Sequence, residues 1–179
     1  MKVLLDACVL FPTVMREVLI GAAQAGLYEP LWSDRLLEEW RRAAARFGPV
    51  EAMQAEAQIA LLRAAFPKAA VQGYEPIEAR LYLPDMADLH VLAAAIKGHA
   101  DVLVTLNAKD FPRHTLAEEG LERLDADQFM MMLHDRAPDQ VAAVVEKVRA
   151  AAEAMDDAPR ETRALMKKAR MPRLGKRLG

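Results

Sequence analysis

Residues 83–112 read LPDMADLHVLAAAIKGHADVLVTLNAKDFP, and this stretch is the most specific indication of the fold. It predicts a helix from Asp85 to about Lys97, because Asp85 can serve as the N-cap and Gly98 follows as a stop. Residues 101–105 (DVLVT) then predict a short buried strand that ends in polar residues. A helix followed directly by a buried strand indicates an α/β protein with a parallel sheet.

A second buried strand is expected at the start of the chain, where residues 2–5 (KVLL) are followed by Asp6. An acid directly after a buried strand is costly unless it is paired or hydrogen-bonded. Sites in parallel sheets form at the carboxyl ends of the strands. If the two strands are neighbours, Asp6 and the 105–110 loop therefore share one crevice.

The rest of the chain is expected to be mostly helical, because alanine is abundant and glycine and proline mark the breaks. Helices are expected over about 14–25, 34–46, 50–65, 116–119, 126–135, 139–154 and 160–170, with short strands near 69–72 and over 121–124. The expected fold is α/β, with a central parallel sheet flanked by helices and only helices from Ala126 onward.

The composition indicates a soluble globular chain, with 53% hydrophobic and 28% charged residues. No apolar stretch approaches the ~20 residues of a membrane span, and Asp6 interrupts the apolar start, so we expect a cytoplasmic protein without a membrane segment. The single cysteine, Cys8, excludes an intrachain disulfide framework and a cysteine-based zinc site. Its apolar surroundings favour a buried structural thiol.

Four acids stand out by position: Asp6 after the first strand, Glu39 two turns into a helix, Asp88 one turn into a helix, and Asp110 after a strand. Carboxylates gathered at one site repel each other and persist where a cation compensates them. Oxygen ligands without paired His or Cys select hard cations such as Mg²⁺ or Mn²⁺. Such a centre suits phosphodiester hydrolysis.

Each of these acids also has a structural interpretation. Asp85 and Asp88 fit a helix cap and its favourable first turn, Glu39 fits a solvated helix face, and Asp110 fits a turn. Structure alone explains Asp6 least well, because of its place behind a buried strand.

The aromatic and imidazole side chains give weaker signals. Trp32 and Trp40 flank the helix of Glu39 and are expected to pack in the core rather than to stack on bases. The histidines show no metal-ligand spacing and are interpreted as surface or partly buried residues: His90, His99, His114 and His134.

Three segments together, VLLDACVLFP (3–12), SDRLLEEWRR (33–42) and the 83–112 stretch, resemble a PIN domain from about Met1 to Leu133. The resemblance implies a Rossmann-like nuclease domain over 1–133 and a helical C-terminal extension over 134–179, as in one bacterial toxin-like branch. It also implies an endoribonuclease that uses Mg²⁺ or Mn²⁺. Many bacterial members are VapC-type toxins, so an antitoxin and a homodimer are the protein partners considered.

The resemblance implies roles for the acids, with Asp6 as the central metal ligand, Glu39 as the helical acid, and Asp88 and Asp110 completing the catalytic set. Glu39 is favoured over Glu38, because the family's acid usually precedes an apolar residue.

Supporting roles are expected for Thr105, Asn107 and Asp85. Many family members carry Thr-x-Asp where this chain has Thr105-Leu106-Asn107, and one branch carries Asn with Asp three residues further on, as here. Asn107 offers a carbonyl oxygen without adding charge. Thr105 is expected to orient a carboxylate or a phosphate by its hydroxyl.

The net charge of −2 hides a basic end, since residues 160–179 hold eight Lys or Arg and one acid and carry +7. The rest of the chain carries −9. We expect basic residues of this end to bind RNA phosphates: Arg163, Lys167, Lys168 and Arg170. Pairing with acids of the body and a solvated disordered tail are the alternatives.

Two other classes of function compete with a nuclease. Asn107 keeps open a non-catalytic PIN-like module that binds RNA or a protein. A phosphatase of the haloacid dehalogenase type would need Asp-x-Asp after the first strand, but Cys8 occupies the second Asp position. The sequence also lacks a recognisable receiver-domain pattern.

Overall fold

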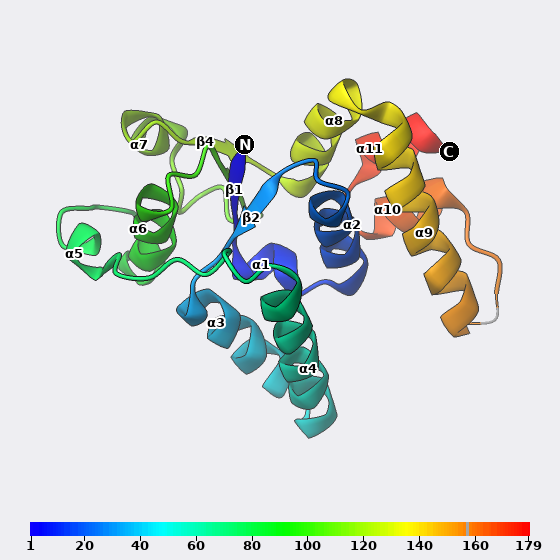
Figure 1. The fold of residues 1–179 in the computed structure, drawn as a ribbon, viewed down its shortest axis with the longest axis horizontal. Coiled ribbons are helices and arrows are strands. Elements are labelled where there is room, and N and C mark those ends of the chain that lie inside the picture. Colours follow the sequence, from blue (N-terminus) through cyan, green and yellow to red (C-terminus); the bar gives the residue numbers. More distant parts are fainter. Residues whose placement is uncertain (157) are drawn as a thin grey trace. The chain divides into compact units, whose positions relative to one another are not determined.

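The computed structural model describes residues 1–156 and 158–179 (Figure 1). These residues form two compact units, unit 1 with Met1–Phe11 and Glu29–Arg123, and unit 2 with Pro12–Tyr28 and Leu124–Gly179. The boundaries of these units differ from those of the predicted domains, 1–133 and 134–179. The predicted domain division stays a prediction. Unit 2 includes an early segment because its helix packs on the C-terminal helices.

A four-stranded parallel sheet has the order β2-β1-β3-β4, which confirms the predicted central parallel sheet. Its strands are β1 (Lys2–Leu5), β2 (Glu29–Leu31), β3 (Val102–Val104) and β4 (Glu122–Leu124). The register of β1 pairs Val3 with Pro30 of β2 and Leu4 with Leu103 of β3. The first strand and the strand of the 83–112 stretch are therefore neighbours, as the shared crevice requires.

Strand β2 was not expected, because Glu-Pro-Leu is short and proline disfavours a strand interior. The strand expected near 69–72 is reduced to an isolated bridge between Trp32 and Ala70.

The helices of unit 1 follow capping signals in the sequence. Ser33 caps the expected helix, with its side chain accepting the Leu36 N–H at 3.2 Å. The helix expected from Asp85 begins instead with a short 3-10 turn, whose start is capped by the Asp85 carboxylate. The elements are α1 (Ala7–Leu10), α3 (Asp34–Ala45), α4 (Pro49–Ala65), α5 (Glu75–Glu78), η1 (Met86–Asp88), α6 (Leu89–Lys97) and α7 (Arg113–Glu118).

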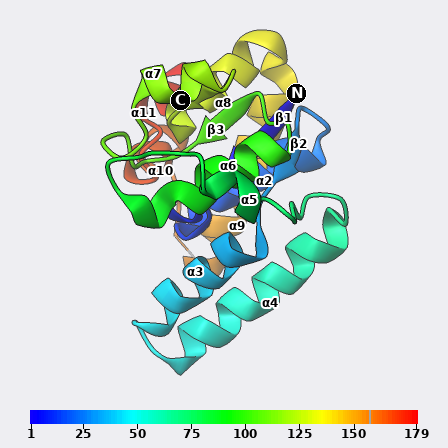
Figure 2. The ribbon, with the colours of Figure 1, turned by 90° about the vertical axis from the view of Figure 1, so that its left-hand side faces the viewer.

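Helix α6 is buried along most of its length, from Leu89 to Ala95, and strand β3 is buried at every residue. Helices α3 and α4 pack side by side as a helical hairpin (Figure 2). Trp32 and Trp40 lie in this core, as predicted. The strands β1 and β3, whose ends carry the candidate site residues, therefore lie in the buried core.

Unit 2 is helical, and its C-terminal part is folded. Its helices are α2 (Thr13–Gln24), α8 (Ala126–Arg136), α9 (Pro138–Asp156), α10 (Thr162–Lys168) and α11 (Pro172–Leu178). The buried Asp127 carboxylate accepts the backbone N–H groups of Arg173 and Leu174 at 3.0 Å each, at the start of α11. The alternative of a disordered tail is therefore wrong for residues 162–178.

None of the helices in the described residues has the length and hydrophobicity of a membrane span.

Candidate metal centre

Asp6 is held where β1 and β3 end. Its backbone N–H donates to the carbonyl of Val104 at 3.1 Å, which continues the pairing of the two strands. Its carboxylate Oδ2 accepts a hydrogen bond from the Thr105 hydroxyl at 2.6 Å and another from the Cys8 thiol at 3.1 Å. Although Asp6 stands at the N-cap of α1, its side chain caps no N–H of that helix. The Asp6 side chain therefore accepts hydrogen bonds from Thr105 and Cys8 and does not cap the helix.

Asp85, Asp88 and Asp110 converge from two loops. One carboxylate oxygen of each lies within 4.8 Å of the others. Asp88 lies in the first turn after the Asp85 cap, as the structural interpretation expected, but its side chain makes no capping hydrogen bond at the start of α6. Asp85 does cap, through the Ala87 N–H at 2.9 Å, and belongs to the acid cluster as well. Asp85 therefore caps this turn and also lies close to Asp88 and Asp110, and its supporting role stays a prediction.

The negative charges of Asp6 and Glu39 also act on Asp88. The pKa of Asp88 is raised to about 6, first by burial and then by the negative charges of Asp6, Asp85, Asp110 and Glu39. We call these five carboxylates the acid cluster. A cation among them would relieve both their repulsion and the cost of their burial.

Glu39 and its neighbour Glu38 point to different partners. Glu38 pairs with Arg41 and Arg42 at 2.7 and 2.8 Å, and hydrogen bonds from these guanidinium groups lower its pKa to about 2. The negative charge of Glu39 contributes to the raised pKa of Asp88. Oε1 of Glu39 lies 2.8 Å from Nε2 of His90. Of the two adjacent acids, Glu39 is the one that contributes to the acid cluster.

His90 differs from its sequence interpretation as a surface or partly buried residue. It is 1% exposed, and Nε2 faces the Glu39 carboxylate, with which it forms an ion pair when the imidazole is protonated. The available signal was its place in α6, two residues after Asp88 and among residues that are buried on every side. Its contact with α3 could not be read from the sequence.

Cys8 also differs from its sequence interpretation, which was a plain core thiol. It is only partly buried and contacts Asp6 and Thr105. Burial, followed by the charge of Asp6, raises the pKa of Cys8 to about 12, so the side chain remains a thiol at neutral pH. Its spacing from Asp6 was the one sequence signal for this role.

Thr105 and Asn107 take the places expected of supporting residues. The buried Thr105 hydroxyl donates to Asp6 and accepts the Asn107 backbone N–H at 2.9 Å. The Asn107 side chain faces Asp88, with Nδ2 donating to Oδ2 at 2.9 Å. The loop after β3 is thus tied to both Asp6 and Asp88.

The donor set fits a hard divalent cation. Every charged group of the acid cluster offers carboxylate oxygens, and Asn107 adds an amide oxygen if its side chain rotates. The contacting thiol of Cys8 keeps its proton, so it does not make the site a thiolate centre. Mg²⁺ or Mn²⁺ suits such a set better than Zn²⁺.

The basic residues expected to bind RNA lie in unit 2 and are all exposed: Arg163, Lys167, Lys168 and Arg170. Arg170 has a φ of 60°, in the left-handed region that favours glycine, between α10 and α11. Arg170 therefore occupies a turn position where glycine would fit with less strain.

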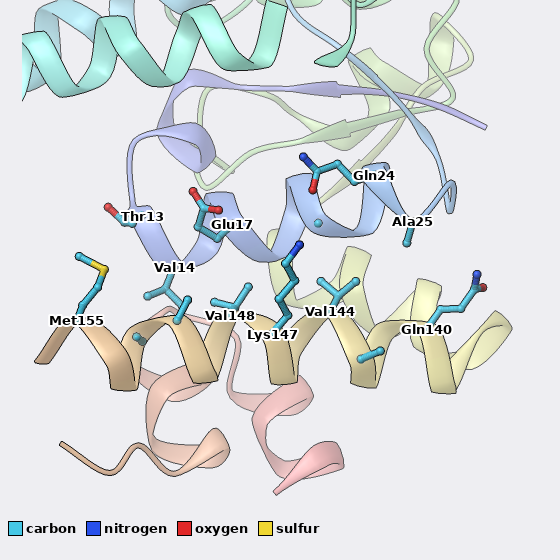
Figure 3. A pocket seen from close by; sticks show the side chains of 14 residues that line it. Thr13, Val14, Glu17, Gln24, Ala25, Gln140, Val144, Lys147, Val148 and Met155 are labelled. Carbon is cyan, nitrogen blue, oxygen red and sulfur yellow. The ribbon is translucent and has the colours of Figure 1, made fainter. Parts of the chain in front are cut away.

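A separate groove of about 460 Å³ runs between α2 and α9 (Figure 3). Val144 and Val148 point from α9 towards α2, and the lining is mostly small and apolar. Among the described residues that line this groove, Glu17 is the only carboxylate, and these residues do not form a set of metal ligands.

The fold is a parallel α/β sheet with carboxylates near the ends of β1 and β3, and three of these carboxylates lie close enough together that they could hold a metal ion. A family model described as PIN domain matches residues 2–109, and the chain belongs to this family. The match spans β1 to β3 and includes Asp6, Glu39 and Asp88, with Asp110 one residue beyond it. No curated protein and no solved structure matched the chain. PIN domains are generally metal-dependent nucleases.

Proposed function

We propose that this protein is a metal-dependent endoribonuclease that hydrolyses RNA phosphodiester bonds. The observation that carries the proposal is the convergence of Asp85, Asp88 and Asp110, whose carboxylate oxygens lie within 4.8 Å of one another. Burial and the nearby charges, those of Asp6 and Glu39 among them, raise the pKa of Asp88 to about 6. Isolated surface acids do not show such mutual repulsion, and a divalent cation is the group that relieves it.

In this proposal Asp6, Glu39, Asp88 and Asp110 hold Mg²⁺ or Mn²⁺, with Asp85 beside them. When bound, such a cation supplies Lewis-acid activation of the phosphate and of the attacking water. Thr105 keeps Asp6 in place, and the loop that carries Asn107 and Asp110 forms one wall of the site. No side-chain nucleophile is needed for this chemistry.

The exposed cations of α10 and of the turn after it are proposed to bind RNA phosphates. Arg163, Lys167, Lys168 and Arg170 are close in sequence, and no ion pair of theirs with an acid is found in the described part of the chain. Phosphate contacts of this kind supply affinity without reading the base sequence. They compensate for the acidic remainder of the chain, which would otherwise repel RNA.

We further propose that the nuclease is the VapC-like toxin of a type II toxin–antitoxin pair. This part rests on the resemblance of the PIN motifs and of the C-terminal helical extension to one toxin-like branch. The antitoxin and a homodimer are proposed on the same ground. A small neighbouring gene whose product binds this chain and suppresses its toxicity on co-expression would support the pairing, and a chain that is harmless when expressed alone would contradict it.

A non-catalytic PIN-like module is the second candidate, since Asn107 occupies a position where many family members carry an acid. One experiment separates the two. Purified protein is incubated with end-labelled RNA in Mg²⁺ or Mn²⁺, and in EDTA. The nuclease proposal predicts fragments with either cation and intact RNA in EDTA, whereas RNA that is bound but never cut would favour the module.

A further inference from the structure

The Cys8 thiol connects the two strand ends that form the candidate metal centre. Its Sγ donates to Oδ2 of Asp6 at 3.1 Å and accepts the backbone N–H of Leu106 at 3.2 Å. The same sulfur lies 3.5 Å from the Thr105 hydroxyl. One small side chain thus joins the carboxylate after β1 to the loop after β3.

The hydrogen bonds to Asp6 are unevenly shared between its two carboxylate oxygens. Oδ2 accepts from both Thr105 and Cys8, while no hydrogen bond from any described residue reaches Oδ1. Two donors on one oxygen fix the plane of a carboxylate more firmly than one, because rotation about the Cβ–Cγ bond would break both. The second oxygen is then presented in a constant direction and keeps its lone pairs for a cation.

We propose that Cys8 is a positioning residue that orients the Asp6 carboxylate for a divalent cation. This inference rests on the proposed function, since it assigns Cys8 a part in the same centre. Hydrogen bonds from residues behind a ligand set its orientation and commonly change metal affinity by 10-fold to 100-fold when they are removed. The thiol acts through Asp6 and need not touch the cation itself.

The Leu106 contact extends this role to the neighbouring loop. The carboxylate of Asp110 and the side chain of Asn107 both follow Leu106 in this loop, and the Leu106 N–H has its partner in Cys8. Without the sulfur this N–H loses its acceptor, and the loop loses one of its ties to the first strand. Loss of Cys8 therefore disturbs the orientation of Asp6 and the position of the loop together.

Cys8 can be tested cleanly, because alanine and serine both fit its space. Cys8→Ala removes the hydrogen bonds with little change in volume. Cys8→Ser is the matched control, since it restores a donor and an acceptor of similar size. A plain packing role would make the two variants similar, because neither restores the apolar sulfur.

The experiment measures Mn²⁺ binding by electron paramagnetic resonance of the free ion, with no RNA present, and the melting temperature of each variant in EDTA. We expect about 10-fold weaker Mn²⁺ binding for Cys8→Ala, binding within about 3-fold of the unsubstituted protein for Cys8→Ser, and little change in melting temperature. Equal affinity of the alanine variant and the unsubstituted protein would overturn the inference, as would equal losses in both variants.

Failure of the proposed function gives a different result in the same experiment. If the unsubstituted protein binds no Mn²⁺, the metal centre itself is refuted, and the role of Cys8 falls with it. If it binds Mn²⁺ but all three proteins bind equally, only the positioning role is refuted. Should the alanine variant fold poorly, the serine variant still decides, because the inference requires it to fold and to bind Mn²⁺ almost as tightly as the unsubstituted protein.

Discussion

The Asn107 amide donates to Oδ2 of Asp88 at 2.9 Å, so the residue that replaces the commoner family acid contacts the most crowded carboxylate of the centre. An amide group here reduces the negative charge around Asp88 when no cation is bound, and it supplies a donor to Asp88. Both effects favour the protein without metal. The cost is one fewer anionic ligand for a cation.

Asn107→Asp should make the metal-free protein less stable and its binding of a cation stronger. The added carboxylate faces Asp88, so we expect a lower melting temperature in EDTA and a larger rise when Mn²⁺ is added, because each carboxylate strengthens attraction to a hard dication. Thermal unfolding with and without Mn²⁺ measures both. Asn107→Ser, which adds no charge, is the control. An aspartate variant that responds to Mn²⁺ no more strongly than the unsubstituted protein would show that position 107 does not face the cation.

Asp88 should make the metal-free protein less stable as the pH rises. Its pKa is raised from 3.8 to about 6 in the fold, so the folded state binds the proton more tightly than the unfolded chain does. The sign follows: this contribution to stability is complete below about pH 4 and is lost as the pH rises through 6.

Asp88→Asn removes that pH dependence while keeping an oxygen for the Asn107 amide. In EDTA, we expect the variant to gain stability relative to the unsubstituted protein between pH 4 and 7, measured by urea unfolding. Asp101→Asn, at the opposite end of β3, is the control and should show no such gain. A stability difference for Asp88→Asn that is the same at pH 4 and pH 7 would argue against the crowded site.

The basic residues of α10 should contribute salt-dependent RNA affinity. Substitution is a better test than deletion, because Leu165, Met166 and Leu174 of the basic end are buried. We expect glutamine at Arg163, Lys167 and Lys168 to weaken RNA binding and to flatten its salt dependence, by about 0.7 in the log–log slope for each lost contact with single-stranded RNA.

The matched control places glutamine at three exposed cations of unit 1, Arg46, Lys68 and Lys97. RNA affinity is measured for all the proteins in EDTA at several salt concentrations. If the two sets of substitutions weaken binding equally, the effect comes from net charge alone, and α10 has no special role.

Asp127 should hold the C-terminal helices together. Its buried carboxylate accepts two backbone N–H groups at the start of α11, and alanine would leave both without an acceptor. We expect Asp127→Ala to lower the free energy of unfolding by about 2–4 kcal/mol, measured by urea unfolding. Asp127→Asn keeps one acceptor and should cost less. An alanine variant as stable as the unsubstituted protein would mean that α11 is not anchored in this way.

Local patterns were enough to predict most of the sheet and helices. The apolar runs before Asp6 and Thr105 became β1 and β3, and Ser33 caps its helix as expected. Helix α11 and strand β2 were missed, because they are short and depend on distant partners. The Asp127 contacts that fix α11 join residues 46 and 47 positions apart, and no local pattern reveals them.

The site was predicted less completely than the fold. The acids could be found because each follows a strand or lies early in a helix, where an unpaired charge needs an explanation. His90 and Cys8 could not be assigned, since their roles depend on which side chains lie opposite them. His90 approaches Glu39 from another helix, and Cys8 meets a loop 98 residues later in the chain. Such pairings arise from tertiary packing, which periodicity does not encode.

The most direct test of the central claim is RNA cleavage by the Asp6→Asn variant in Mn²⁺, beside the unsubstituted protein and the Asp101→Asn control. Asparagine keeps the shape of Asp6 and an acceptor for Thr105 but removes one negative charge of the acid cluster. We expect cleavage by the unsubstituted protein and by the Asp101 variant, and a loss of at least about 100-fold for Asp6→Asn with its fold intact. Cleavage by the Asp6 variant at the rate of the unsubstituted protein would rule out a nuclease centre that depends on the Asp6 carboxylate.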